Sequence, residues 1–181
     1  MRNLFSAAVL SALYFTIVPG SVLAQGASTH AFGPIAEVLR HPRCMNCHTV
    51  TNFPRQTDQR LRHAQLVVRG KDGHGAPTLQ CNACHQDRNV ADGKVPGAPH
   101  WHLAPLSMGW ENLDDTQLCE ALLDRSKNGN RSVSDLVHHM TVDALVLWGW
   151  SPGGDRTLPP YPHAEFVSYL EDWADAGAPC P

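Results

Sequence analysis

The stretch Cys44-Met45-Asn46-Cys47-His48 recurs further along the chain as Cys81-Asn82-Ala83-Cys84-His85, and this repeated C-x-x-C-H motif decides how the chain is interpreted. Two thiols at this spacing can each form a thioether with one edge of a porphyrin, and the histidine that follows can ligate its iron. The sequence therefore predicts two covalently bound c-type haems. Their predicted attachment residues are Cys44, Cys47, Cys81 and Cys84, and their predicted proximal axial ligands are His48 and His85.

A zinc site made of four cysteines is the alternative interpretation of two C-x-x-C pairs. The stretch of chain between Cys47 and Cys81 is long for a compact zinc ribbon. A histidine directly after both pairs would also be a coincidence in such a site. The motif therefore favours haem over zinc.

The N-terminus has the three parts of a secretory signal peptide. A short positively charged start at Arg2 is followed by an uncharged, mostly apolar run from Leu4 to Val18, and small residues precede Ala24. An uncleaved membrane anchor is the alternative, but the run is shorter than the roughly twenty residues that span a bilayer. We expect residues 1–24 to be removed after Ala24 and the mature chain to be periplasmic.

The charge of the expected mature chain, residues 25–181, is acidic. The segment before it contains Arg2 and no acidic side chain, so its removal lowers the count of Lys and Arg from 14 by one and leaves all 17 Asp and Glu. This balance disfavours nucleic acid and anionic membrane surfaces as partners. No second apolar run approaches membrane length, so we expect no membrane span in the mature chain.

Two cysteines remain outside the motifs, Cys119 and Cys180. An even pair in an oxidising compartment most simply forms a disulfide, here one that would close a loop of about sixty residues. A buried pair of free thiols is the alternative. We expect the disulfide, because it would compensate for the limited side-chain core of a small protein that encloses two porphyrins.

The length of residues 25–181 predicts one domain of mainly α class, with long loops rich in glycine and proline. It would consist of a haem-binding segment, 25–112, and a helical segment, 113–181. Short-range signals predict helices at four places: residues 34–40, residues 115 to about 127 after an Asp114 cap, a stretch after a Ser132 cap, and a stretch from about residue 163. Strand signals are poor.

Each iron needs a sixth ligand or an open position, and several histidines lie outside the motifs. His63 follows the first motif and His102 follows the second at a similar interval, so these two are the leading candidates for distal ligands. Lower-ranked candidates are His139, His163 and Met108, each of which has a simpler role in packing or capping. A methionine ligand would raise the haem potential relative to two histidines.

Four further stretches carry a family resemblance: Trp101-His102-Leu103, Leu147-Trp148-Gly149-Trp150, His163-Ala164-Glu165-Phe166, and the segment from Trp173 to Pro181. With the motifs, they make the whole mature chain resemble small exported di-haem cytochromes that carry the label isoquinoline 1-oxidoreductase subunit. The resemblance implies a molybdenum hydroxylase as the redox partner. It does not imply that this chain oxidises isoquinoline, because no molybdopterin or iron–sulfur motif is present.

The sequence thus predicts a di-haem cytochrome c that carries electrons between redox partners. No catalytic triad, carboxylate pair or activated nucleophile points to independent catalysis. A haem enzyme with one open iron, of a peroxidase-like or small-oxyanion reductase kind, is one alternative. A haem-based redox sensor is another.

Overall fold

The structure is a computed structural model that describes residues 31–181. The predicted signal peptide, residues 1–24, lies outside the described residues. The helices are α2 (Gly33–Leu39), α3 (Pro42–Met45), α4 (Asp115–Leu123), α5 (Val133–Val142), α6 (Ala144–Leu147) and α7 (His163–Asp175). Three 3-10 turns accompany them, η1 (Cys81–Ala83), η2 (Leu106–Met108) and η3 (Trp148–Trp150).

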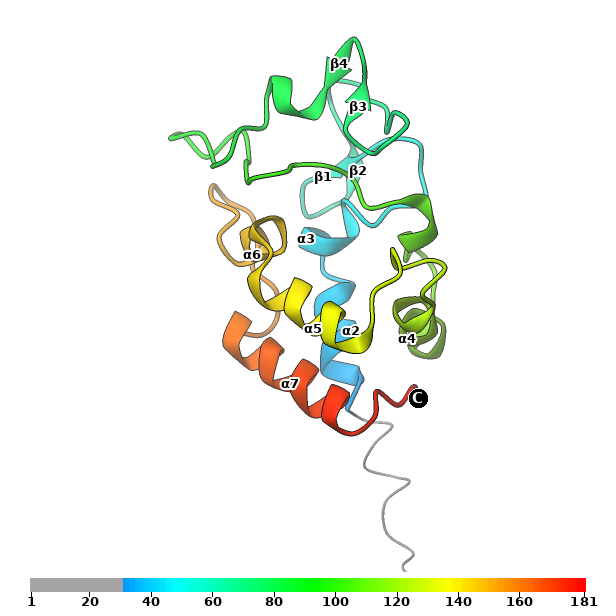
Figure 1. Ribbon diagram of the computed structural model, residues 1–181. Coiled ribbons are helices and arrows are strands. Elements are labelled where there is room, and N and C mark those ends of the chain that lie inside the picture. Colours follow the sequence, from blue (N-terminus) through cyan, green and yellow to red (C-terminus); the bar gives the residue numbers. More distant parts are fainter. Residues whose placement is uncertain (1–30) are drawn as a thin grey trace, which may run out of the picture.

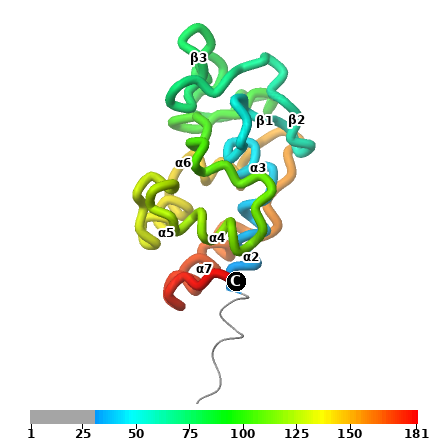
Figure 2. Tube along the Cα trace, turned by 90° about the vertical axis from the view of Figure 1, so that its right-hand side faces the viewer, coloured from blue at the N-terminus to red at the C-terminus, as the bar shows by residue number. Residues whose placement is uncertain are grey.

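The strands are short and form two hairpins. β1 (Arg55–Gln56) pairs antiparallel with β2 (Leu61–Arg62), with Arg55 opposite Arg62. β3 (Gly75–Ala76) pairs antiparallel with β4 (Leu79–Gln80), with Gly75 opposite Gln80. Both hairpins lie at one end of the molecule, and α2, α4, α5 and α7 lie at the other (Figures 1 and 2).

Helix caps follow the sequence signals closely. Asp114 and Gln117 form the predicted capping box of α4, and Ser132 forms a second one with Asp135 at the start of α5. The prediction that the first of these helices runs to about Lys127 is wrong, because α4 ends at Leu123. The Asp124 carboxylate accepts hydrogen bonds from the Ser126 N–H and hydroxyl, and this local turn competes with the helix.

The hydrophobic core lies among the four longer helices. α7 packs on α5 and α2, and α2 also packs on α4, so a helix from the N-terminal segment is enclosed by C-terminal ones. The fully buried side chains include Phe32, Ile35, Leu118, Phe166 and Trp173. The rings of Phe32 and Trp173 lie 5.6 Å apart between centroids and join α7 to the start of α2.

The predicted disulfide is confirmed. Cys119 on α4 is bonded to Cys180, with their Cα atoms 5.6 Å apart. The Trp173 indole N–H donates to the Pro179 carbonyl at 2.9 Å beside it. The disulfide therefore fastens the C-terminal residues against the helical core.

Within residues 31–181, none of the helices is both long enough and apolar enough to span a membrane, as predicted for the mature chain. Residues 46–114 contain only the short strands and two of the 3-10 turns. This long irregular segment carries the second motif and most of the residues around the site described next.

Candidate cofactor site

The two C-x-x-C-H motifs adopt the same local turn. In the first motif the N–H groups of Cys47 and His48 both donate to the Cys44 carbonyl, at 3.1 and 3.0 Å. In the second, the N–H groups of Cys84 and His85 donate to the Cys81 carbonyl, at 3.2 and 2.9 Å. α3 supplies the first turn and η1 the second, so different elements produce one backbone arrangement.

The motif cysteines form no disulfide, and Cys47, Cys81 and Cys84 line one cavity. Burial raises the pKa of Cys44 to about 12, and burial followed by the nearby Cys81 thiol raises the pKa of Cys47 to about 11. Both thiols of the first motif are therefore protonated at neutral pH. Within residues 31–181, no group of three or more His, Cys, Asp or Glu side chains is found arranged to hold a metal ion directly.

The two motif histidines have matching surroundings. The Nδ1 atom of His48 lies 2.8 Å from the Met108 carbonyl oxygen, and the Nδ1 atom of His85 lies 2.7 Å from the Pro96 carbonyl oxygen. A carbonyl oxygen only accepts, so each Nδ1 carries the proton and each Nε2 keeps its lone pair. This tautomer is the one that a metal ion requires of a histidine that ligates through Nε2.

A tryptophan ring stacks on each of these imidazoles. Trp110 lies on His48 with the ring centroids 3.4 Å apart and the planes at 12°. Trp101 lies on His85 at 4.6 Å and 7°. The orientation of each imidazole is thus set twice, by a carbonyl acceptor and by an aromatic face.

Burial keeps both imidazoles neutral. Burial lowers the pKa of His48 to about 3, although the hydrogen bond to the Met108 carbonyl raises this pKa in part. Burial also lowers the pKa of His85, against the Pro96 carbonyl. Neutral imidazole is the form that ligates a metal ion, so neither ring has to lose a proton first.

The second motif opens onto a cavity of about 580 Å³, a size in the usual range for small-molecule and cofactor sites. Cys81, Cys84 and His85 line it from the motif, and Cys47 reaches it from the first motif. The apolar part of the wall includes Pro54, Val67, Leu79, Val95, Trp101, Leu103 and Trp148. A planar, mostly apolar cofactor fixed at Cys81 and Cys84 fits a cavity of this size and lining.

Cationic side chains stand at the same cavity. Arg43, Arg55, Lys94 and Arg156 all line it. The Arg43 side chain is only 1% exposed and contacts Asp58, yet its Nε atom has no hydrogen-bond partner among the described residues. A buried guanidinium N–H of this kind is costly unless an acceptor reaches it. The carboxylate groups that a haem carries are acceptors of the required charge.

Of the leading distal candidates, His63 has its ring near that of His85, and Cys47 of the first motif lines the same cavity. The ring centroid of His63 is 6.0 Å from that of His85, with the planes at 72°, and both rings line the cavity. His102 also lines the cavity. Its Nδ1 atom is hydrogen-bonded to the His100 carbonyl, and its ring stacks on His74 at 5.0 Å.

The lower-ranked candidates lie elsewhere. The Nδ1 atom of His139 on α5 lies 3.3 Å from the Asp143 carboxylate. The Nε2 atom of His163 is engaged by the Met140 carbonyl at 3.0 Å, in the contact between α5 and α7. The Met108 side chain belongs to the hydrophobic core, while its carbonyl receives the His48 hydrogen bond.

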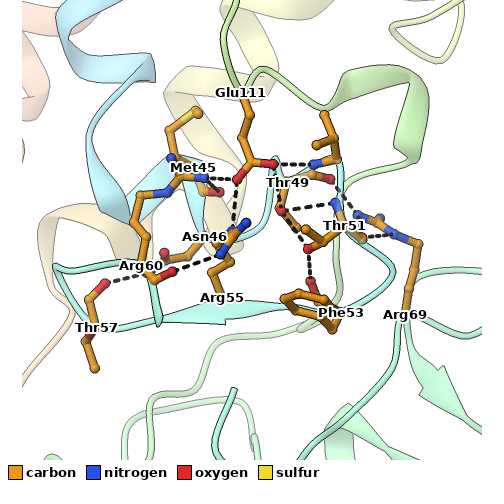
Figure 3. Close-up of polar contacts among 11 residues, drawn as sticks. Met45, Asn46, Thr49, Thr51, Phe53, Arg55, Thr57, Arg60, Arg69 and Glu111 are labelled. Carbon is orange, nitrogen blue, oxygen red and sulfur yellow. Dashed lines mark hydrogen bonds and ion pairs between the residues drawn. The ribbon is translucent and has the colours of Figure 1, made fainter. Parts of the chain in front are cut away.

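A polar cluster around Glu111 holds the segment that follows the first motif (Figure 3). Its carboxylate accepts from Arg55 Nε at 2.9 Å, from the Val50 N–H at 2.9 Å and from the Thr49 hydroxyl at 3.2 Å, and it also pairs with Arg60. Arg69 completes the cluster by donating to the Thr49 carbonyl at 2.8 Å and to the Thr51 carbonyl. Glu111 thereby connects the chain after His48 to the β1–β2 hairpin.

Segment 101–103 is placed by the loop before the second motif. The Leu103 N–H donates to the Gly73 carbonyl at 2.9 Å. Gly73 has φ +80°, and a Cβ atom there would lie 2.5 Å from the Leu103 carbonyl oxygen, so the close approach requires glycine. This contact brings Trp101 to His85. Neither the stacking of the tryptophans on the motif histidines nor the Glu111 cluster was predicted from the sequence. The one related signal in the sequence is that Trp101 directly precedes the candidate ligand His102.

Comparisons with protein families, with curated proteins and with solved structures found no match to this chain. The resemblance to di-haem cytochromes and the mainly α fold class therefore stay predictions, and the site is interpreted from its own geometry.

Proposed function

We propose that this protein is a di-haem c-type cytochrome that passes electrons between redox partners outside the cytoplasm. The observation that carries the proposal is the matched state of His48 and His85. Each follows a C-x-x-C pair, donates from Nδ1 to a main-chain carbonyl and lies under a tryptophan ring. Two independent segments reach this arrangement, and it leaves both Nε2 atoms ready to ligate an iron.

The cysteines would attach the cofactor. Cys44, Cys47, Cys81 and Cys84 would hold the two haems through thioether bonds, each S–H adding across one vinyl group so that no atom would leave. The common turn at Cys44 and at Cys81 holds the following histidine close to its two thiols. When bound, each haem supplies an iron that accepts and releases one electron.

The rest of the site would orient and shield the cofactor. The apolar side chains of the cavity would contact a haem held there, and Arg43 and Arg156, which also line the cavity, would be available to pair with its carboxylates. Burial and the hydrogen bonds of the axial histidines are the means by which a protein sets a haem potential. The cavity lining, the arginines and the two motif histidines are therefore the features that would hold and tune the haem of an electron carrier.

An electron carrier is favoured over a haem enzyme because candidate sixth ligands lie near the second motif. The ring centroids of His63 and His85 are 6.0 Å apart, and His102 lines the same cavity. An enzyme of the peroxidase or reductase kind needs one iron with an open position. The partner proposed from the resemblance is a molybdenum hydroxylase, and native co-purification tests that part of the proposal.

The cofactor content is tested by expressing the chain with a c-type haem maturation system and measuring the mass of the denatured protein. We expect two covalently retained haems in the wild type and one in the Cys81→Ser/Cys84→Ser variant. Cys119→Ser/Cys180→Ser is the matched control, because it also removes two cysteines and should keep both haems. A wild-type protein without covalent haem would contradict the proposal.

The type of function is tested by electron paramagnetic resonance of the purified oxidised protein. We expect two low-spin irons, as in a carrier whose coordination positions are filled. One low-spin and one high-spin iron would favour the haem-enzyme alternative instead.

A further inference from the structure

We propose that His63, from the loop that follows the first motif, is the sixth ligand of the iron attached at the second motif, opposite His85. The inference rests on the proposed function. It adds that a histidine which follows the first motif in the chain ligates the iron held at the second motif. Sequence spacing associates His63 with His48, because the first motif precedes it directly in the chain. The structure instead brings it to His85, the histidine of the second motif.

The separation of the two rings suits a shared iron. A bond between a metal ion and an imidazole nitrogen is about 2 Å long, and the ring centroid lies roughly 1 Å behind that nitrogen. Two imidazoles on opposite sides of one iron therefore have centroids roughly 6 Å apart. The observed separation of His63 and His85 is 6.0 Å, across the cavity that Cys81 and Cys84 also line.

His63 is held in place by its backbone, while its ring is only weakly engaged. It directly follows β2, and its N–H donates to the Pro54 carbonyl at 3.1 Å. The ring nitrogen Nδ1 accepts from the Gln65 N–H at 3.4 Å, which is at the long end of the hydrogen-bond range, and ligation through Nε2 would require this weak contact to be lost so that Nδ1 carries the proton.

The hairpin that presents His63 is fastened to the first motif. Arg55 on β1 pairs with Glu111, and the Gln56 side chain accepts the Ala64 N–H at 3.2 Å. Arg60, in the turn between the strands, pairs with the same Glu111. The chain around the first haem would therefore hold a ligand of the second, which links the two sites mechanically.

His102 is the competing ligand for this iron, since it lines the same cavity. Its Nδ1 atom donates to the His100 carbonyl, which leaves Nε2 with its lone pair as in His48 and His85, but its ring is stacked on His74. No contact between the rings of His102 and His85 is found in the described part of the chain, whereas His63 and His85 form one. The geometry therefore favours His63.

The test compares the full di-haem protein with its His63→Ala, His102→Ala and His138→Ala variants, the last being an exposed histidine of α5 as control. We expect His63→Ala alone to convert one of the two irons to high spin, seen by electron paramagnetic resonance, and free imidazole to restore the low-spin signal. Both irons remaining low-spin in His63→Ala would overturn the inference. Since the wild type would still hold two haems, the proposed function would survive.

A second comparison identifies the haem. In the Cys81→Ser/Cys84→Ser chain, which is expected to carry only the first haem, adding His63→Ala should leave the optical spectrum unchanged. A change to high spin in that chain would assign His63 to the first iron and overturn the inference. The spin count in the full protein decides whether His63 ligates even if this one-haem chain does not accumulate.

Discussion

Replacing Glu111 by glutamine should destabilise the protein, because this carboxylate joins four partners from two parts of the chain. The side chain of Glu111 is 10% exposed, and those of Arg55 and Arg60 are 28% and 27% exposed. Glutamine has nearly the same shape but no charge, and its amide group presents N–H donors where a second oxygen now accepts. The variant therefore loses acceptors without leaving a large cavity.

The magnitude follows from the contacts. A hydrogen bond to a charged group contributes about 1.5–3 kcal/mol, and breaking a fully buried ion pair costs about 3–5 kcal/mol. The two arginines are partly hydrated, which reduces the loss, so we expect about 2–3 kcal/mol. For a protein of this length that is a decrease in Tm of roughly 4–12 °C.

The assay is thermal unfolding of the mature protein followed by far-ultraviolet circular dichroism. Glu120→Gln is the matched control, since Glu120 is an exposed residue of α4 and its replacement should change stability by less than about 0.5 kcal/mol. A Tm of Glu111→Gln equal to that of the control would refute the role given to this cluster.

The same carboxylate predicts a pH dependence. Burial raises the pKa of Glu111, but the Val50 N–H, Arg55, Arg60 and the Thr49 hydroxyl together lower it below its usual 4.5. The folded state therefore binds this proton more weakly than the unfolded state does, and stability from Glu111 is present above about pH 4.5 and lost as the pH falls through the folded pKa. The difference in Tm between wild type and Glu111→Gln should shrink below about pH 4.5.

Two further predictions concern the core and the first motif. Removing the disulfide in Cys119→Ser/Cys180→Ser should cost about 4 kcal/mol, because the sequence separation of 61 residues makes the closed loop long; denaturant unfolding should show this loss, and addition of a reductant should then affect only the wild type. Replacing Trp110 by alanine should cost about 3–5 kcal/mol, because the side chain is 4% exposed and stacks on His48. That variant should also shift the potential of one haem in a redox titration, whereas Val142→Ala, at a residue 51% exposed on α5, should change neither quantity. Unchanged stability and potentials in Trp110→Ala would contradict the role of its stacking.

Features that depend on neighbouring residues could be predicted from the sequence. The caps at Asp114 and Ser132 and the start of α7 at His163 appear where the local sequence predicted them. The exception is the end of α4, where the Asp124 carboxylate accepts hydrogen bonds from Ser126 and the helix ends at Leu123, before the predicted end near Lys127. The disulfide could be predicted because only two cysteines remained.

Only the tertiary structure decided what lies opposite each motif. His63 reaches His85, and the Met108 carbonyl accepts from His48, 60 residues away in sequence. Glu111 binds Val50 and Arg55, each of which is more than fifty residues from it in sequence. Such contacts depend on how the long irregular segment 46–114 folds back on itself, and no periodic pattern encodes that path. The sequence alone thus determined which residues can attach and ligate a haem, while packing decided which histidine faces which motif.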